Sequence, residues 1–267
     1  MALHGRHTED EQAMKSTAET VGIGHSYRGR AALADVTFSL SPGTTALVGV
    51  NGAGKSTLLR IIAGALKPGA GSIRLLDRDP YRLGGRSTAL RQVALMPQLA
   101  VFPPNMTVVE VVSFIGWMRG LKAHRASDRA MRVIEQVGLG DRAHEKVKAL
   151  SGGMVRRVAL AQALVSEPDV LLLDEPSTGL DPEQRRIMVR LIQGLETTVL
   201  FSSHVIEDVA DVADRVLVLE EGRLVFDDNL SALEAMGAQA TSSAEGQSSG
   251  IEAGFLRVVS RNRGNRA

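Results

Sequence analysis

The stretch GVNGAGKST, Gly49 to Thr57, follows the apolar run TTALVGV and leads into a helix-like segment, Lys55 to Leu66. It fits the pattern G-x-x-x-x-G-K-[ST] in the strand–turn–helix context that the pattern requires. Gly52 and Gly54 allow backbone angles that turn successive N–H groups inward, toward an anion. The stretch therefore predicts a phosphate-binding loop within an α/β fold.

The side chains of this loop predict how a nucleotide would be held. Lys55 would reach the β- and γ-phosphates, and the Ser56 hydroxyl would ligate Mg²⁺. The predicted nucleotide-binding set in the loop is Gly49, Asn51, Gly52, Ala53, Gly54, Lys55, Ser56 and Thr57.

The segment VLLLDE, Val170 to Glu175, is an apolar run that ends in two carboxylates. Continuous hydrophobicity fits a parallel strand buried on both faces, and ligands of open α/β sheets gather at the carboxyl ends of such strands. Adjacent strand residues point in opposite directions, so the two acids have different roles. Asp174 is predicted to hold Mg²⁺, directly or through water, and Glu175 to polarise an attacking water.

Strand and helix patterns alternate along most of the chain. Strand patterns cover residues 35–40, 44–50, 72–76, 92–96, 170–175, 197–203 and 215–226. Between about Pro103 and Ala149 they vanish, and TVVEVVSFIGWMRGL and SDRAMRVIEQVGL predict successive helices. The predicted fold is an α/β P-loop core sheet with an N-terminal antiparallel β region and an inserted α-helical lobe.

The two ends of the chain differ from this core in composition. Residues 1–19 predict a flexible tail, residues 20–236 a single domain, and residues 237–267 a linker-like tail. Within the last segment, FLRVVSRNRGNRA has room for one short strand before a basic end. That basic end either touches anionic lipid or stays solvated.

Composition excludes several classes of function. The net charge is +1, from 31 basic and 30 acidic residues, so electrostatic binding to nucleic acid is not expected. The chain has no cysteine, which excludes disulfides, thiol nucleophiles and cysteine-ligated zinc and fits a cytoplasmic protein. Apolar runs fall short of the ~20 residues that a membrane helix needs, and the N-terminus lacks the apolar core of a signal peptide.

A second anion site is predicted in LSGGMVRRVALAQAL, Leu150 to Leu164. Serine prefers caps and glycine is a poor helix former, so Ser151, Gly152 and Gly153 indicate the start of a helix. A helix N-terminus with little side chain in the way attracts anions. One phosphate loop in one chain does not by itself explain a second such site.

The phosphate loop, the serine–glycine helix start and the apolar run ending in Asp-Glu occur in an order that resembles the ATP-binding cassette (ABC) ATPases, over about Thr20 to Ala235. In that family the signature is LSGGQ, and two subunits sandwich two ATP molecules head to tail. The resemblance implies that Ser151, Gly152 and Gly153 contact the γ-phosphate held by a second cassette. Met154 departs from the usual glutamine, while the serine and both glycines are kept.

The resemblance also assigns roles to four other positions. Tyr27 would stack on the adenine, Gln98 in LMPQL would touch Mg²⁺ or water, and His204 in FSSHVIED would contact the γ-phosphate. Asp181 in STGLD belongs to the segment that crosses to the opposite subunit, and Asp181-Pro182 also predicts a helix start.

Together these assignments imply an active ATPase with ATP and Mg²⁺ as its ligands. ATP would close two subunits, and hydrolysis would remove the charge that holds the interface together. The predicted catalytic residues are Lys55, Glu175 and His204. The predicted Mg²⁺ ligands are Ser56, Gln98 and Asp174.

The resemblance implies a transport ATPase that acts with a second ABC ATPase subunit, most simply a homodimer, and a separate integral-membrane permease. This places the chain in the cytoplasm, peripheral on the inner face of the cell membrane. FPPNMTVVE and LSGGM…RR are similar to exporters of drugs, antibiotics, lipids or polysaccharides. Trp117 and Met118 either anchor the partner or belong to the core of the lobe. A soluble single-cassette ATPase, such as an iron–sulfur assembly ATPase, is the alternative.

Overall fold

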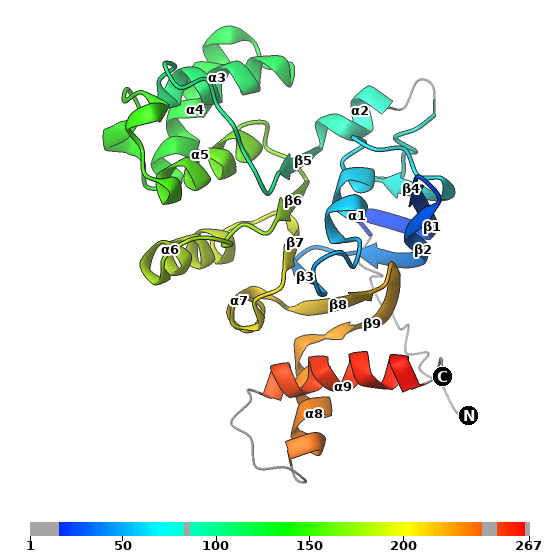
Figure 1. Cartoon of the computed structure of the whole chain (residues 1–267). Coiled ribbons are helices and arrows are strands. Elements are labelled where there is room, and N and C mark those ends of the chain that lie inside the picture. Colours follow the sequence, from blue (N-terminus) through cyan, green and yellow to red (C-terminus); the bar gives the residue numbers. More distant parts are fainter. Residues whose placement is uncertain (1–15, 83–85, 242–249, 265–267) are drawn as a thin grey trace, which may run out of the picture.

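The central element of the fold is a six-stranded sheet with the order β5-β6-β7-β3-β8-β9. The structure is a computed structural model that describes residues 16–82, 86–241 and 250–264 (Figure 1). The strands of this sheet are β3 (Thr44–Val48), β5 (Val93–Met96), β6 (Val170–Asp174), β7 (Thr198–Ser203), β8 (Arg215–Glu220) and β9 (Arg223–Asn229). All neighbours pair in parallel except β8 and β9, which form an antiparallel pair. Every residue of β6 and β7 is buried, and the continuous apolar run of β6 predicts this burial.

A second, three-stranded antiparallel sheet has the order β2-β1-β4. Its strands are β1 (Ala18–Tyr27), β2 (Arg30–Leu40) and β4 (Ala70–Leu75). This confirms the antiparallel β region that the sequence predicts. Because β1 begins at Ala18, the expected N-terminal tail ends earlier than residue 19, and residues 1–15 lie outside the described part of the chain.

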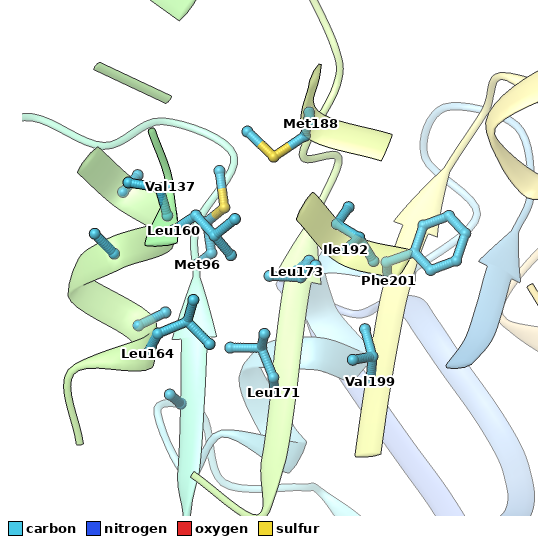
Figure 2. Close-up of a cluster of buried hydrophobic side chains, with 14 of the residues drawn as sticks. Met96, Val137, Leu160, Leu164, Leu171, Leu173, Met188, Ile192, Val199 and Phe201 are labelled. Carbon is cyan, nitrogen blue, oxygen red and sulfur yellow. The ribbon is translucent and has the colours of Figure 1, made fainter. Parts of the chain in front are cut away.

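The two faces of the central sheet bury separate apolar clusters. Leu171 and Leu173 of β6 point to one face and pack against Leu160 and Leu164 of α5 (Gly152–Leu164), as Figure 2 shows. Leu172 points to the other face, in the cluster that contains the apolar residues of α1 (Lys55–Ile62). The alternation along one strand therefore places α5 and α1 on opposite sides of the same sheet.

Helix α1 is shorter than the sequence predicts. It ends at Ile62 rather than at Leu66, because Gly64 adopts a φ of 69° and redirects the chain. The amide of Ala65 then donates to the carbonyl of Arg60 over 2.9 Å, which closes the last turn.

The helical lobe lies at one end of the molecule in Figure 1. It contains α3 (Val108–Met118) and α4 (Ala123–Gln136), and both pack against α5. Thr107 begins α3 with a capping box: its hydroxyl accepts from the Glu110 amide over 3.3 Å, and the Glu110 carboxylate accepts from the Thr107 amide over 2.7 Å. Outside the lobe lie α2 (Arg86–Arg91), α6 (Pro182–Gln193) and α7 (Ile206–Val212), and short 3₁₀ turns occur at Gly140–Arg142 and Val147–Ala149.

The described part of the C-terminal segment is helical, so the short strand predicted there is wrong, as is a linker over residues 237–241 and 250–264. Residues 242–249, which make up most of the linker-like sequence, and residues 265–267 lie outside the described part of the chain. Helices α8 (Leu230–Thr241) and α9 (Gly250–Gly264) pack side by side at the end of the molecule opposite the lobe (Figure 1). The contact is so close that a Cβ on Gly254 would lie 2.1 Å from the Leu233 carbonyl oxygen. Gly237 and Gly250, which belong to the linker-like sequence, also meet here, because a Cβ on Gly237 would lie 1.8 Å from the Gly250 carbonyl oxygen.

Among the described residues, no helix combines the length and the apolar character needed to cross a membrane.

Candidate nucleotide-binding site

The predicted phosphate loop is a tight turn between β3 and α1. The amide of Ala53 donates to the Val50 carbonyl over 3.1 Å, and Gly52 and Gly54 have φ angles of 83° and 109°. A Cβ on Gly54 would lie 2.5 Å from the carbonyl oxygen of Ala32. Only glycine therefore fits at position 54, where the loop passes close to the backbone of β2.

Lys55 lies folded across this loop. Its ammonium donates to the Gly49 carbonyl over 2.6 Å, and its Nζ lies 3.6 Å from Oε1 of Glu175. The side chain is only 5% exposed. Burial lowers the pKa of Lys55 below its ordinary value, and the charge of Glu175 offsets part of that effect.

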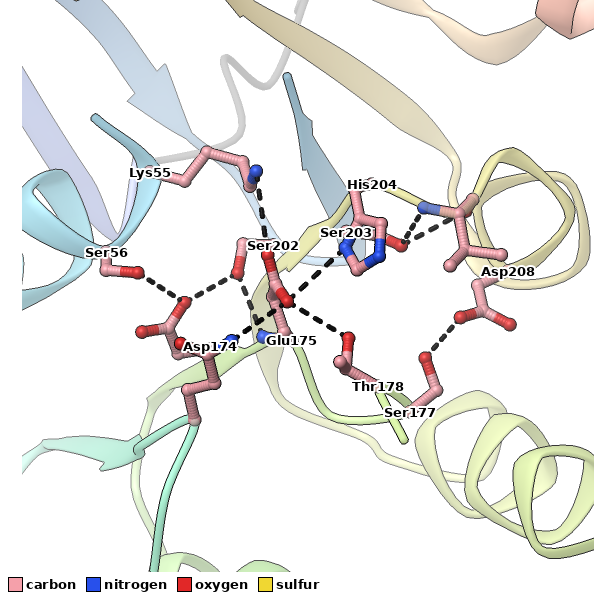
Figure 3. A network of polar contacts seen from close by, with 12 residues as sticks. Lys55, Ser56, Asp174, Glu175, Ser177, Thr178, Ser202, Ser203, His204 and Asp208 are labelled. Atoms are coloured by element: carbon pink, nitrogen blue, oxygen red, sulfur yellow. Dashed lines mark hydrogen bonds and ion pairs between the residues drawn. The ribbon is translucent and has the colours of Figure 1, made fainter. Parts of the chain in front are cut away.

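The carboxylate of Asp174 faces the start of α1. Its Oδ1 accepts hydrogen bonds from the hydroxyls of Ser56, over 3.0 Å, and Ser202, over 2.8 Å (Figure 3). The Ser202 hydroxyl also accepts from the amide of Glu175 over 2.9 Å, so it fixes the carboxyl end of β6. Hydroxyl and carboxylate oxygens close together are the ligand types that Mg²⁺ prefers.

Glu175 points away from Asp174, into a separate group of polar side chains. Its Oε2 accepts from Gln98 Nε2 over 3.1 Å and from the Thr178 hydroxyl over 3.0 Å, and lies 3.3 Å from His204 Nδ1. Together with Lys55, four side chains from four segments surround this carboxylate (Figure 3). The backbone of Glu175 has a φ of 49°, a strained conformation that is typical of functional sites.

A cavity of about 910 Å³ lies against the phosphate loop and the group around Glu175 and has the size of a small-molecule site. It is lined by Tyr27, Arg30, Ala31, Ala32, Asn51, Gly52, Ala53, Gly54, Lys55, Ser56, Thr57, Gln98, Glu175, Thr178, His204, Glu221 and Gly222. Gly49 and Asp174 are not among the described residues that line it, although Asp174 contacts Ser56, which does. Tyr27 is 46% exposed, and its ring packs edge-on against His25 with 4.8 Å between the ring centroids.

Sequence reasoning missed the wall of this cavity formed by the β8–β9 turn. Gly222 donates its amide to the carbonyl of Ala53 over 3.0 Å, so the turn holds the phosphate loop from the side. The Glu221-Gly222 dipeptide is a turn signal in the sequence. Its position depends on the pairing of β8 with β3, which no local pattern reveals.

Ser151, Gly152, Gly153 and Asp181 are not among the described residues that line this cavity. Ser151 caps α5, with its hydroxyl accepting from the Met154 amide over 3.3 Å. Ser151 and Gly152 are exposed, and a Cβ on Gly152 would meet no described atom within 4 Å. The start of α5 is thus exposed, with no described atom covering Gly152.

Asp181 caps α6 by accepting from the amides of Glu183, over 3.0 Å, and Gln184, over 2.9 Å. The same region is tied to α7 by Asp208, which accepts from the Ser177 hydroxyl and, over 2.5 Å, from Arg185. The loop after Glu175 and the helix after His204 are therefore linked outside the cavity as well.

Fold and site define a P-loop nucleotide-binding protein of the α/β class. A model of the family described as "ABC transporter" matches residues 33–178. The chain belongs to the ABC transporter family, as an ATP-binding cassette, which confirms the family that the motifs indicate.

Curated relatives have related descriptions. "Uncharacterized ABC transporter ATP-binding protein YxlF" of Bacillus subtilis is 36% identical over 212 residues, which cover 78% of this chain and 70% of that protein. "Nod factor export ATP-binding protein I" of Burkholderia thailandensis is 40% identical over 71% of this chain and 63% of its own length. "Daunorubicin/doxorubicin resistance ATP-binding protein DrrA" of Streptomyces peucetius is 34% identical over 81% of this chain and 66% of its own. The alignments thus span about two thirds of these relatives.

Solved structures show the same fold. An ATP-binding subunit of an ABC transporter superposes with a TM-score of 0.76 at 25% identity, over 91% of this chain and all of the other. The cassette cbiO1 of Clostridium perfringens, described as part of the ABC transporter complex cbiONQ, gives 0.73 at 28% identity over 85% and 94% of the two chains. These comparisons confirm the α/β cassette fold with its antiparallel sheet and helical lobe.

Proposed function

We propose that this chain hydrolyses ATP to drive a separate membrane permease that exports a small molecule. The observation that carries the proposal is the convergence of Lys55, Ser56, Glu175 and His204 on one cavity of nucleotide size, with Asp174 hydrogen-bonded to Ser56 behind it. Phosphoryl transfer requires a cation near the phosphates, a carboxylate for the metal ion and a group that orients water, and Lys55, Asp174 and Glu175 are proposed to supply these.

The protein groups fit Mg²⁺ together with a triphosphate. Ser56 and Asp174 offer oxygen ligands 3.0 Å apart, and Gln98 is the third predicted ligand. In the described part of the chain, no three His, Cys, Asp or Glu side chains converge as a metal site, so phosphate oxygens and water would complete the coordination. The ion would neutralise charge on the phosphates.

The remaining groups prepare the attack of water. Glu175 would accept the proton of the attacking water as general base, because it lies at the carboxyl end of β6 beside Lys55. His204 would contact the γ-phosphate, and Tyr27 at the exposed side of the cavity would stack on the adenine.

A second copy of the chain would complete each site. Ser151 and Gly152 are exposed at an open helix start and lie outside the described lining of their own chain's cavity. Two chains arranged head to tail would place this helix start, together with the segment of Asp181, against the other chain's nucleotide. A homodimer is proposed because every predicted position is present in this chain.

The substitution Ser151→Arg distinguishes a site completed by a second chain from a site formed within one chain. We expect ATP binding to persist, because the cavity of the substituted chain is intact, and turnover to fall by about 10²-fold through the loss of one phosphate-binding cap. Loss of the cap also costs about 1 kcal/mol of stability. Filter binding and steady-state hydrolysis, measured on the same preparation, check this. If binding and turnover fall equally, Ser151 does not act across an interface.

The proposed permease contact lies beside Gln98. Leu99 and Val101 follow it and are exposed, and Phe114, Trp117 and Met118 present an exposed apolar face on α3. Trp117 is 57% and Met118 63% exposed, which favours the anchor interpretation over the interpretation as lobe core. Export is proposed because relatives are described as Nod factor export and drug resistance proteins.

Affinity purification from detergent-solubilised native membranes tests the proposal. We expect a multi-span membrane protein to copurify with the tagged chain, and its identity would narrow the class of cargo. A matched chain with Trp117→Ser and Met118→Ser should recover less of it. Recovery of only soluble partners, with the chain absent from the membrane fraction, would contradict the transport function.

A further inference from the structure

Arg156 makes an unusual set of contacts outside the cavity. From α5, its guanidinium donates to backbone carbonyls in two different loops: to Pro97 over 3.4 Å and Gln98 in one, and to Glu175 over 2.5 Å and Pro176 over 3.2 Å in the other. One side chain thus holds the segments that follow β5 and β6.

Both of these loops carry residues of the proposed active site. Gln98 follows β5, Glu175 follows β6, and their side chains meet over 3.1 Å. Arg156 itself belongs to the helix that begins beside Ser151, the residue proposed to meet the nucleotide of a second chain. It is therefore the physical link between the start of α5 and the chain's own water-activating group.

The chemistry of arginine suits this position. Its planar guanidinium has five N–H donors in a fixed fork, so Nε and both terminal nitrogens can bind carbonyls that diverge from one another. Here all three nitrogens are used. A lysine at the same place would keep the charge but would lose the fork, and with it the defined geometry between the two loops.

We propose that Arg156 is a positioning residue that couples the two nucleotide sites of a dimer. Binding of a partner's nucleotide at Ser151 fixes α5, and through Arg156 it fixes the backbone of Gln98 and Glu175 in the same chain. This inference rests on the proposed function, since it assigns a coupling role within that same site.

Arg119 provides a matched control. It follows α3 and donates its guanidinium to the carbonyls of Arg91, over 3.4 Å, and Val93, at the opposite end of β5. Both arginines tie the helical lobe to the core through backbone carbonyls near β5. Of these two arginines, Arg156 makes its contacts at the carboxyl end of β5, near Gln98 and Glu175, and Arg119 makes its contacts at the amino end.

The first test measures local order without hydrolysis. In the full chain, Arg156→Lys should raise amide hydrogen exchange in residues 98–102 and 177–178, because the loops lose their common anchor. Arg119→Lys should raise exchange near residues 91–94 instead. Equal patterns in the two variants, or no change for Arg156→Lys, would overturn the inference.

The second test measures steady-state hydrolysis as a function of ATP concentration. For Arg156→Lys we expect KM to stay within about twofold while kcat falls by about tenfold or more, because the base is misplaced and binding is intact. The Hill coefficient should fall toward one, since coupling between the sites is lost. Arg119→Lys should keep the kcat and the Hill coefficient of the unsubstituted chain.

The two tests separate the inference from the proposed function. If the unsubstituted chain hydrolyses ATP and Arg156→Lys keeps its kcat and cooperativity, the coupling role is wrong and the ATPase function stands. If the unsubstituted chain with its permease does not hydrolyse ATP, the proposed function fails, and with it the coupling that Arg156 was proposed to provide.

Discussion

Glu175→Gln is expected to lower the rate of ATP hydrolysis by about 10²- to 10⁴-fold, the contribution of a general base, while ATP stays bound. The amide has the size of the carboxylate and still accepts from Thr178 and Gln98, so the loop after β6 should keep its shape. What it loses is the basic oxygen that would take the proton of the attacking water.

This variant should also accumulate a closed dimer. ATP and Mg²⁺ would complete the interface, and without hydrolysis the charge that holds it would remain. Light scattering with and without nucleotide measures the mass. Glu207→Gln, at a side chain that is 76% exposed, is the matched control and should hydrolyse ATP like the unsubstituted chain. A Glu175→Gln chain that stays monomeric with ATP and Mg²⁺ would contradict the sandwich arrangement.

Lys55→Met is expected to weaken ATP binding by about 100-fold or more. Each charge-assisted hydrogen bond to a phosphate contributes about 1.5–3 kcal/mol, and the ammonium is placed to reach two phosphates. Calorimetric titration measures the affinity. Lys67→Met, at an exposed lysine after α1, is the control and should bind ATP normally. Near-normal affinity of the Lys55 variant would mean that the loop is not a phosphate site.

The same substitution should stabilise the chain in the absence of nucleotide. Burial lowers the pKa of Lys55 below 10.5, so the folded state holds that proton less tightly than the unfolded state does. The charged ammonium therefore destabilises the fold at pH values below the folded-state pKa. That penalty fades as the pH rises from the folded-state pKa toward 10.5.

We accordingly expect Lys55→Met to have a higher melting temperature than the unsubstituted chain at pH 7, with the difference shrinking as the pH approaches 10.5. Thermal unfolding followed by circular dichroism over this pH range measures the difference in melting temperature and its sign. A lower melting temperature at pH 7 would show that the pairing with Glu175 outweighs the cost of burial.

Local motifs explain why much of this fold could be predicted from the sequence. The conformations of the phosphate loop and of the run VLLLDE can be predicted from a few residues each. The continuous apolar sequence of a strand likewise predicts that the strand is buried on both faces. The contacts that they make with each other follow from the same motifs, because parallel strands bring their carboxyl ends together.

The features that could not be predicted depend on distant contacts. Helix α9 has apolar residues at helical spacing, Ile251, Phe255 and Val258, but the run FLRVV also fits a short strand. Its packing against α8, where Gly254 comes close to Leu233, distinguishes the two. The turn at Gly222 belongs to the cavity only because β8 pairs with β3. In the sequence, Arg156 is an ordinary charged residue on a predicted helix. Its proposed role depends on hydrogen bonds to backbone carbonyls of two loops that lie far away in the sequence.

The pairing of Lys55 with Glu175 links nucleotide binding to the proposed hydrolytic step. The ammonium that is proposed to bind the triphosphate is the same group that pairs with the Glu175 carboxylate, with 3.6 Å between Nζ and Oε1. An incoming triphosphate would compete with Glu175 for this ammonium, so nucleotide binding would rearrange the groups around the proposed base. Nucleotide binding and the surroundings of the proposed base are therefore linked through one lysine side chain.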